Sequence, residues 1–310
     1  MSSLVFSLEL AYWQQTTIRC VAALAAVLIP AGTLVYLYLF KMMSFMQSRL
    51  GPMEAGPYGS LQLLAEVGKF LQKEDIIPRN ADRVVFKAAP FVVLASTFLL
   101  VLVLPAGPDA WFINVDTGVF LALAVSSISV IGILMAGWGS ASKYSLLGGL
   151  RAAGQLVAYE LPLVLAVMGV VIQAGTLNVQ EIVLSQANGE IFGWGGIGNP
   201  YVLTQFLGFA IFLVAVQAEL TQPPFDMPVA ESEIVTGYLT EYSGMRFLLF
   251  FIGEFATAGI FSALAATFFL GGWYVPGLDP ASDLFNVIGP LALLTKMILV
   301  SFLIFWFRFP

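Results

Sequence analysis

Long apolar runs recur along the chain and dominate its pattern. Seven of them reach the length of a membrane-spanning helix, at 18–40, 84–104, 117–137, 154–174, 201–219, 247–272 and 285–307. The hydrocarbon core of a bilayer is about 30 Å thick and takes about 20 residues of helix to cross. Because lipid offers no hydrogen-bond partners, each run must satisfy its backbone groups internally, as a helix does. The pattern predicts an all-α integral membrane protein, a single membrane domain over 1–310 with seven transmembrane helices.

Lys and Arg are concentrated in alternate connections between these runs. They are frequent in 41–83, whereas the connections 105–116, 175–200 and 273–284 contain neither. Basic residues of short loops stay on the cytoplasmic side of the membrane. We therefore expect 41–83 and the loop 219–246 in the cytoplasm and the N-terminus outside. The start of the chain lacks a basic region and a small-residue cleavage site, so we expect the first span to be retained.

The segment 41–83 contains one further helical pattern. Its apolar positions recur at helical spacing opposite a polar set, and the two faces are Leu63, Leu64, Val67, Phe70 and Leu71 against Gln62, Glu66, Lys69 and Lys73. A helix with one apolar and one polar face lies in the membrane interface. The pattern predicts an amphipathic interfacial helix in this cytoplasmic segment.

Composition narrows the chemistry that the chain can carry. It is 59% hydrophobic and 10% charged, against about 25% charged in ordinary soluble domains. It has no His and a single Cys, Cys20, so it cannot ligate a haem through His or hold a Cys-ligated cluster alone. We interpret Cys20 as a buried thiol without a role. Walker A, Rossmann and metal-spaced motifs are absent from the sequence. We expect no metal site and no nucleic-acid partner.

Acidic residues gather between the fifth and sixth runs. The segment 219–246 holds five carboxylates before its first basic residue, namely Glu219, Asp226, Glu231, Glu233 and Glu241. One interpretation is a solvated acidic loop. The interspersed aromatic and aliphatic residues instead favour a loop folded against protein. Carboxylates held close together in such a place cannot all ionise, so their pKa values rise and couple. The cluster would then exchange protons.

Ionisable residues within the apolar runs are costly and indicate function. The clearest are Glu160, Glu254 and Lys296, with Tyr159 beside the first of them. The structural alternative is that Glu160 and Lys296 pair to relieve burial. The functional interpretation is a proton path that uses these residues and water.

Four stretches in order along the chain carry a family resemblance. They are Arg49-Leu-Gly-Pro through 61–62 to 73–78; Gly137-Trp138 with 143–151 and Tyr159-Glu160; Pro224-Phe225-Asp226 through 241–244; and Gly271-Gly-Trp273. Together they resemble the NuoH/NdhA-type membrane component of complex I, the NADH:quinone oxidoreductase. The match runs from about residue 20 to the end of the sequence.

The resemblance implies a subunit of an oxidoreductase, with no catalytic residue or bound redox cofactor of its own. Quinone would be the substrate, and it would bind in a chamber enclosed together with iron–sulfur-bearing peripheral-arm subunits. Small and antiporter-like membrane subunits would be the other partners, in a bacterial-type plasma membrane or an equivalent energy-transducing membrane. By the same resemblance, the five loop carboxylates lie beside the quinone tunnel, and Glu160 and Lys296 continue the proton path. Arg49, Glu66 and Lys69 would frame the tunnel entrance.

The chain departs from the family pattern in several places. Leu39 and Phe40 stand where the family usually has Glu-Arg, Gln222 replaces an Arg, and Val229 replaces a Glu. The family also has an eighth helix, which we expect to be missing because this sequence is incomplete. Three other functions remain open: the membrane subunit of an energy-converting hydrogenase, a secondary ion or solute transporter that binds its cargo at Glu160 and Lys296, and a passive anchor for a soluble enzyme.

Overall fold

The computed structural model describes residues 12–189, 198–277 and 285–307. Every regular element within these ranges is a helix. In chain order they are α2 (Tyr12–Leu34), the π-helix η1 (Val35–Met42), α3 (Met43–Met46), η2 (Pro57–Gly59), α4 (Gln62–Gln72), α5 (Arg83–Leu102), α6 (Gly118–Ser126), α7 (Ile128–Gly139), α8 (Lys143–Ala174), α9 (Val179–Ala187), α10 (Tyr201–Thr204), α11 (Phe206–Glu219), α12 (Glu231–Ile234), η3 (Gly237–Leu239), α13 (Gly244–Phe269) and α14 (Phe285–Trp306).

All seven predicted apolar runs form helices. Among the described residues, six helical stretches are long and apolar enough to cross a bilayer, at Cys20–Met46, Arg83–Leu102, Gly118–Gly139, Lys143–Ala174, Gly244–Phe269 and Phe285–Trp306. The all-α membrane fold is thereby confirmed. The fifth run, 201–219, is shorter than predicted, because the helix breaks at Gln205 and α11 has 14 residues. The Gln205 side chain there donates to the Gly169 carbonyl of α8 at 2.7 Å.

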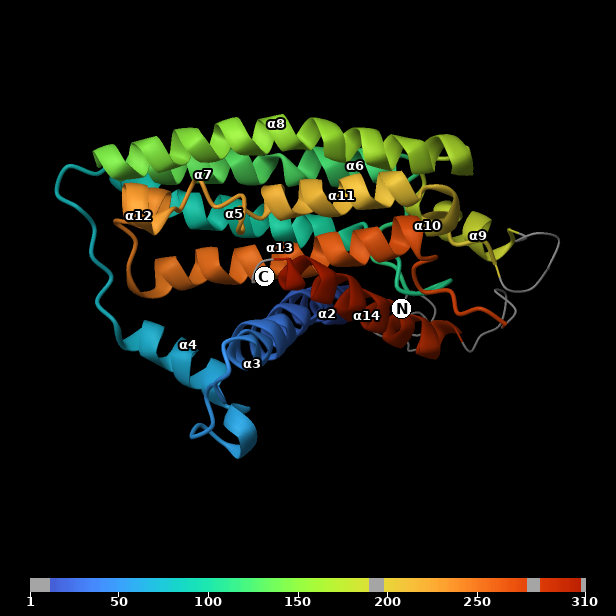
Figure 1. Cartoon of the computed structure of the whole chain (residues 1–310), viewed down its shortest axis with the longest axis horizontal. Helices are drawn as coiled ribbons and strands as arrows, with labels where there is room; N and C mark the ends of the chain where they lie inside the picture. The colour runs from blue at the N-terminus through green and yellow to red at the C-terminus, as the bar shows by residue number, and fades with distance from the viewer. Residues whose placement is uncertain (1–11, 190–197, 278–284, 308–310) are drawn as a thin grey trace.

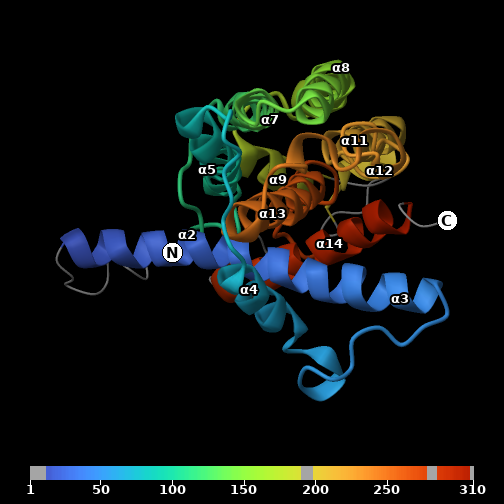
Figure 2. The same ribbon diagram turned by 90° about the vertical axis from the view of Figure 1, so that its left-hand side faces the viewer.

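The helices form a bundle with one member set across it. In Figure 1, α5, α7, α8, α11 and α13 run side by side along the long axis. In Figure 2 the same helices are seen nearly end-on, while α2 and α3 extend across the bundle. Small residues allow the closest contacts: a Cβ on Gly137 of α7 would lie 2.8 Å from the Ser145 carbonyl of α8. Such close approach is typical of helix pairs in membranes.

The π-helix within the first span was not predicted from the hydrophobic pattern. It turns Tyr38 toward α14, where the buried ring stacks on Phe305 with centroids 5.1 Å apart and the hydroxyl donates to the Ile298 carbonyl. π-helical turns are rare and occur often at functional sites. Here the side chain of Tyr38 in the π-helix links the first span to α14.

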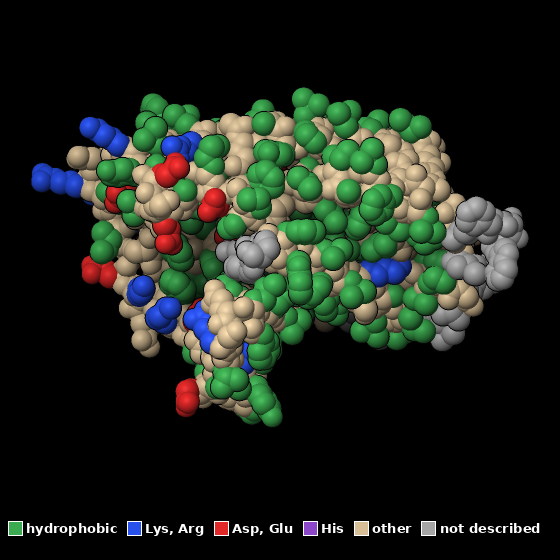
Figure 3. Space-filling model, in the orientation of Figure 1, with side chains coloured by type: hydrophobic (Ala, Val, Ile, Leu, Met, Phe, Trp, Pro, Cys, Tyr) green, Lys and Arg blue, Asp and Glu red, His purple; other side chains and the backbone are tan. Residues whose placement is uncertain are grey.

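The segment 41–83 leaves the bundle and returns to it through α4. Helix α4 covers the predicted amphipathic pattern, and its Phe70 ring packs on Phe247 of α13 with centroids 5.6 Å apart. An ion pair of 2.9 Å between Arg246 and Asp75 holds the returning chain to the start of α13. The position of α4 at a membrane surface stays a prediction. In Figure 3 most of the visible charged side chains lie toward the left of the view, the side on which α4 and α12 lie in Figure 1. Hydrophobic side chains are spread over the rest of the visible face.

Cys20 corrects one expectation. Its side chain is exposed on α2 rather than buried. An apolar run in a membrane helix has a face toward lipid as well as one toward protein, so membership of such a run does not predict burial.

Candidate functional site

An apolar cavity of about 320 Å³ lies between α2, η1, α4 and α13. It is lined by Leu28, Ala31, Gly32, Val35, Leu63, Leu64, Glu66, Val67, Phe70, Leu248, Phe251, Ile252 and Phe255. Glu66 is the charged residue in this lining, so one of the three predicted entrance residues borders the cavity. The cavity has the composition of a site for a largely apolar ligand with one polar end.

The other two predicted entrance residues lie outside that lining. Arg49 is exposed in the turn after α3. Lys69 is exposed on α4, with its ammonium 4.8 Å from the centre of the Phe70 ring. Phe70 itself borders the cavity, so Lys69 contacts a wall residue from outside.

Polar side chains, buried amides and half-buried carboxylates, collect where α11 meets α8 and α13. We call this group the carboxylate–amide cluster; its members are Gln155 and Glu160 of α8, Gln217 and Glu219 of α11, Gln222 after α11, and Glu254 of α13. The Gln222 side-chain nitrogen donates to a Glu254 carboxylate oxygen at 3.1 Å. Gln155 donates to the carbonyls of Ala218 and Phe225, each at 2.7 Å. The amides thus connect three helices around the carboxylates.

Glu219 is the carboxylate of the loop that turns inward. The charge of Glu160 is close enough to repel that of Glu219. One Glu219 oxygen is buried and has no hydrogen-bond partner among the described residues, and the same holds for the side-chain oxygens of Gln217 and Gln222. A buried acceptor without a donor is destabilising by about 1–3 kcal/mol. The cluster therefore has an unmet capacity to accept hydrogen bonds, from a proton on a carboxyl group or from water.

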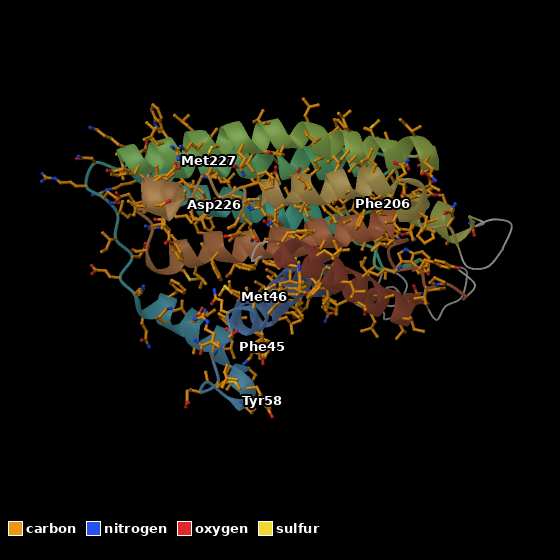
Figure 4. All side chains as sticks on the ribbon, viewed as in Figure 1. Phe45, Met46, Tyr58, Phe206, Asp226 and Met227 are labelled. Carbon is orange, nitrogen blue, oxygen red and sulfur yellow. The ribbon has the colours of Figure 1, made fainter. Side chains whose placement is uncertain are left out.

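The remaining loop carboxylates do not join this cluster. Glu231 and Glu233 are exposed on α12, where Glu233 forms an ion pair with Arg151 of α8. Asp226 and Glu241 are half-buried. Figure 4 places Asp226 and Met227 in the connection between α11 and α12. The predicted group of five is thus divided between one inward carboxylate and four near the surface.

Two tyrosines anchor the loop against the bundle. Tyr242 stacks on Phe86 of α5 with centroids 4.1 Å apart, and its hydroxyl donates to the Phe86 carbonyl at 3.0 Å. Burial raises the pKa of Tyr242 above its ordinary value, and Arg246 partly opposes the rise. Burial and then the charge of Glu254 raise the pKa of Tyr238 as well. Both phenols therefore stay neutral across the physiological range.

Tyr159 and Lys296 make contacts that the sequence pattern did not indicate, and their role in a proton path stays a prediction. The Tyr159 ring meets Phe225 edge-on at 5.1 Å, so it packs against the loop. Lys296 of α14 donates to the carbonyls of Leu270, Gly272 and Tyr274 at 2.7, 2.9 and 2.6 Å, an arrangement that we call the carbonyl cap. An ammonium group has three donors, and all are used here. No ion pair joins Lys296 to Glu160, both of which the structure describes.

Sequence reasoning missed the amides of the cluster. Gln155 and Gln217 interrupt apolar runs, and this was the signal that could have found them. Neutral amides cost less than charges in a membrane and so attract less attention. Within the described ranges, no group of three or more His, Cys, Asp or Glu side chains could hold a metal ion.

The fold and the site define a class: an all-helical membrane protein with half-buried carboxylates and buried amides between its helices and an apolar cavity along α13. The family model described as NADH dehydrogenase matches residues 18–309. The H-type subunit of the NADH-quinone oxidoreductase of Brevibacillus brevis is 39% identical over 298 residues, which cover 96% of this chain and 84% of the relative. The proteins of the same name from Bacillus thuringiensis and Bacillus anthracis are 43% identical over 269 residues, 86% of this chain and 76% of each relative. The chain belongs to the NADH dehydrogenase family of membrane subunits.

Proposed function

We propose that this chain is the quinone-binding membrane subunit of a complex I-type oxidoreductase and couples quinone reduction to proton translocation. The observation that carries the proposal is the apolar cavity beside α13. Its lining residues Phe251, Ile252 and Phe255 surround Glu254 in the sequence of that helix, and Glu254 belongs to the carboxylate–amide cluster. A lipid-soluble quinone fits an apolar cavity, and the protons that accompany its reduction need carboxylates close by.

The proposed electron donor is a partner subunit. The chain has no His and one Cys, so iron–sulfur clusters would be held by peripheral-arm subunits. A docking surface for them is available around α12, where Met227 and Val235 are exposed beside Glu231 and Glu233. Exposed apolar side chains ringed by charges are typical of protein interfaces. Small and antiporter-like membrane subunits would receive the protons or the conformational signal.

The proposed orientation follows from the basic residues. The connections that carry them, including 41–83 and 219–246, would face the cytoplasm. The carbonyl cap would then lie toward the opposite side, and α4 would lie along the cytoplasmic surface of a plasma membrane or equivalent energy-transducing membrane.

Filling the cavity tests the quinone site. Val67 borders it, so Val67→Trp should raise the KM for a long-chain quinone about tenfold, which corresponds to about 1.4 kcal/mol. Leu71→Trp is the matched control, because Leu71 is exposed on the same helix and lies outside the lining. Equal KM values for both variants and for the unmodified complex would count against this cavity as the quinone site.

The metal content of the purified complex separates the alternatives. Iron without nickel, together with inhibitor-sensitive quinone reduction, is the expected result for the tagged chain isolated with its partners. Nickel would favour a membrane subunit of an energy-converting hydrogenase. Isolation without metal or partners would favour a transporter.

A further inference from the structure

A second apolar cavity, of about 370 Å³, lies between α2, α5, α13 and α14. Its inner wall includes Val27 of α2 and Ala263 of α13, which are buried, and its edge includes Ile29 of α2 and Leu291 of α14, which are 62% and 61% exposed. The cavity therefore opens between α2 and α14, which lie next to each other in Figures 1 and 2. Both helices belong to stretches long and apolar enough to span a bilayer, so in a membrane the opening faces lipid hydrocarbon.

This second cavity differs in chemistry from the cavity proposed for quinone. No polar side chain lines it, whereas Glu66 borders the other. The two cavities share no lining residue, and they follow one another along α13, with Phe255 in the wall of the first and Ala256 in the wall of the second. A quinone head group has two carbonyl oxygens, which need hydrogen-bond donors when they are buried. The second cavity offers no side-chain donor for them.

The apolar lining decides what can fill the second cavity. Water needs polar partners, and apolar cavities in proteins stay dry. An empty cavity is also unfavourable, because the side chains around it lose dispersion contacts and the loss grows with volume. A flexible hydrocarbon chain supplies those contacts and needs no hydrogen bond. Phospholipid acyl chains are the hydrocarbon that a bilayer presents at the opening.

The connection 103–117, between α5 and α6, bears on the head group of such a lipid. Ala106 and Phe112 of this connection line the second cavity. The connection also contains Asp109 and Asp116, which are exposed, and it contains neither Lys nor Arg. A head group with an ammonium group, such as phosphoethanolamine, is complementary to this charge, whereas an anionic head group without an ammonium group would be repelled.

We propose that the second cavity is a phospholipid site, in which an acyl chain lies between α2 and α14 and an ethanolamine head group lies beside the connection 103–117. The inference goes beyond the proposed function and does not depend on it. The three helices meet at Gly259 of α13, which lines the cavity: a Cβ there would lie 3.1 Å from Leu34 of α2 and 3.9 Å from Met297 of α14. The acyl chain fills the space beside this crossing and leaves the cavity proposed for quinone free.

Filling the second cavity in the complete complex tests the site. Ala26 belongs to its lining, so the Ala26→Phe complex should retain fewer phosphatidylethanolamine molecules than the unmodified complex after purification in mild detergent. Lipid extraction followed by mass spectrometry with internal standards measures the number retained per complex. Ala22→Phe is the matched control, because Ala22 lies a turn earlier on α2 and outside the lining of both cavities. This control should retain as much phosphatidylethanolamine as the unmodified complex.

Adding lipid back to the delipidated complex tests the head group. Phosphatidylethanolamine should bind about threefold more tightly than phosphatidylglycerol at low salt, because exposed charges each contribute little. Equal retention in Ala26→Phe and Ala22→Phe, or loss of quinone instead of phospholipid from Ala26→Phe, would overturn the site. Equal or tighter binding of phosphatidylglycerol would overturn the head-group assignment. If Ala26→Phe does not assemble, Ala25→Ile, which adds less volume to the same lining, decides by the same measurements.

Discussion

Helix α13 is associated with buried polar groups at two places that differ in how completely they are hydrogen-bonded. Glu254 lies in the carboxylate–amide cluster, and the carbonyl of Leu270 lies in the carbonyl cap, roughly 24 Å further along at about 1.5 Å per residue. In the cluster, three side-chain oxygens are left without donors among the described residues. In the cap, Lys296 uses all three of its donors. One place can accept additional protons or water, and the other cannot.

Gln186 of α9, near the carbonyl cap, also has hydrogen bonds at both its side-chain oxygen and its side-chain nitrogen. Its oxygen accepts from Gly271 N–H at 2.9 Å and from Tyr201 N–H at 3.2 Å, and its nitrogen donates to the Thr267 carbonyl at 2.9 Å. The neighbouring Trp273 is fully buried and donates to Gln180 at 3.2 Å. A saturated network specifies one arrangement and resists change, whereas a partly satisfied network has room to exchange protons. We therefore infer a structural role for the cap and a functional role for the cluster.

The largest expected effect is on the cap. Lys296→Met would leave three carbonyls without their charged donor, so the free energy of unfolding should fall by about 3 kcal/mol. Thermal unfolding of the detergent-solubilised complex measures the change. Thr295→Ala is the control, because Thr295 is exposed and its hydroxyl donates to the Leu291 carbonyl within the same helix. A stable Lys296→Met complex that reduces quinone but no longer pumps protons would instead place Lys296 on the proton path.

The second-largest effect is expected in the carboxylate–amide cluster, where a substitution should not lower the free energy of unfolding. Glu219→Gln replaces a carboxyl group whose ionised form is repelled by Glu160, so the free energy of unfolding should stay level or rise by about 1 kcal/mol. Proton pumping should fall about tenfold, equivalent to about 1.4 kcal/mol, because the amide cannot exchange a proton. Proteoliposome pumping assays and thermal unfolding of the same preparation measure both. Glu231→Gln, at an exposed position of the same loop, should change neither quantity. Unaltered pumping in Glu219→Gln would remove this residue from the path.

The smallest effect is expected at the surface ion pair. The side chains of Arg151 and Glu233 are 35% and 59% exposed, and pairs of this kind contribute about 0–1 kcal/mol. Arg151→Ala should therefore lower the free energy of unfolding by less than about 1 kcal/mol, as measured by thermal unfolding at low and high salt. If Arg151→Ala lowers the free energy of unfolding as much as Lys296→Met does, the completeness of hydrogen bonding does not determine how much each site contributes to stability.

The positions of the helices along the chain were largely accessible from the sequence, since hydrophobic runs of spanning length must be helical in lipid. The sequence was a poorer guide to which side chains face the interior of the bundle. The divided acidic loop depends on which carboxylate faces α8, and Glu219 does so because it ends α11, while Glu231 and Glu233 lie on the separate α12. Cys20 shows the same limit, because a membrane helix exposes apolar residues on its lipid side.

The sequence by itself determined the class of fold, the membrane-spanning runs, the amphipathic segment and the family, because each depends on composition, period or motif order. Only the tertiary structure decided which polar groups meet: Gln222 with Glu254, Glu219 with Glu160, and Lys296 with three carbonyls. These partners are far apart along the chain, and their contacts arise from packing between helices. Spacing along one helix predicts its faces, but it does not predict which neighbour each face will meet.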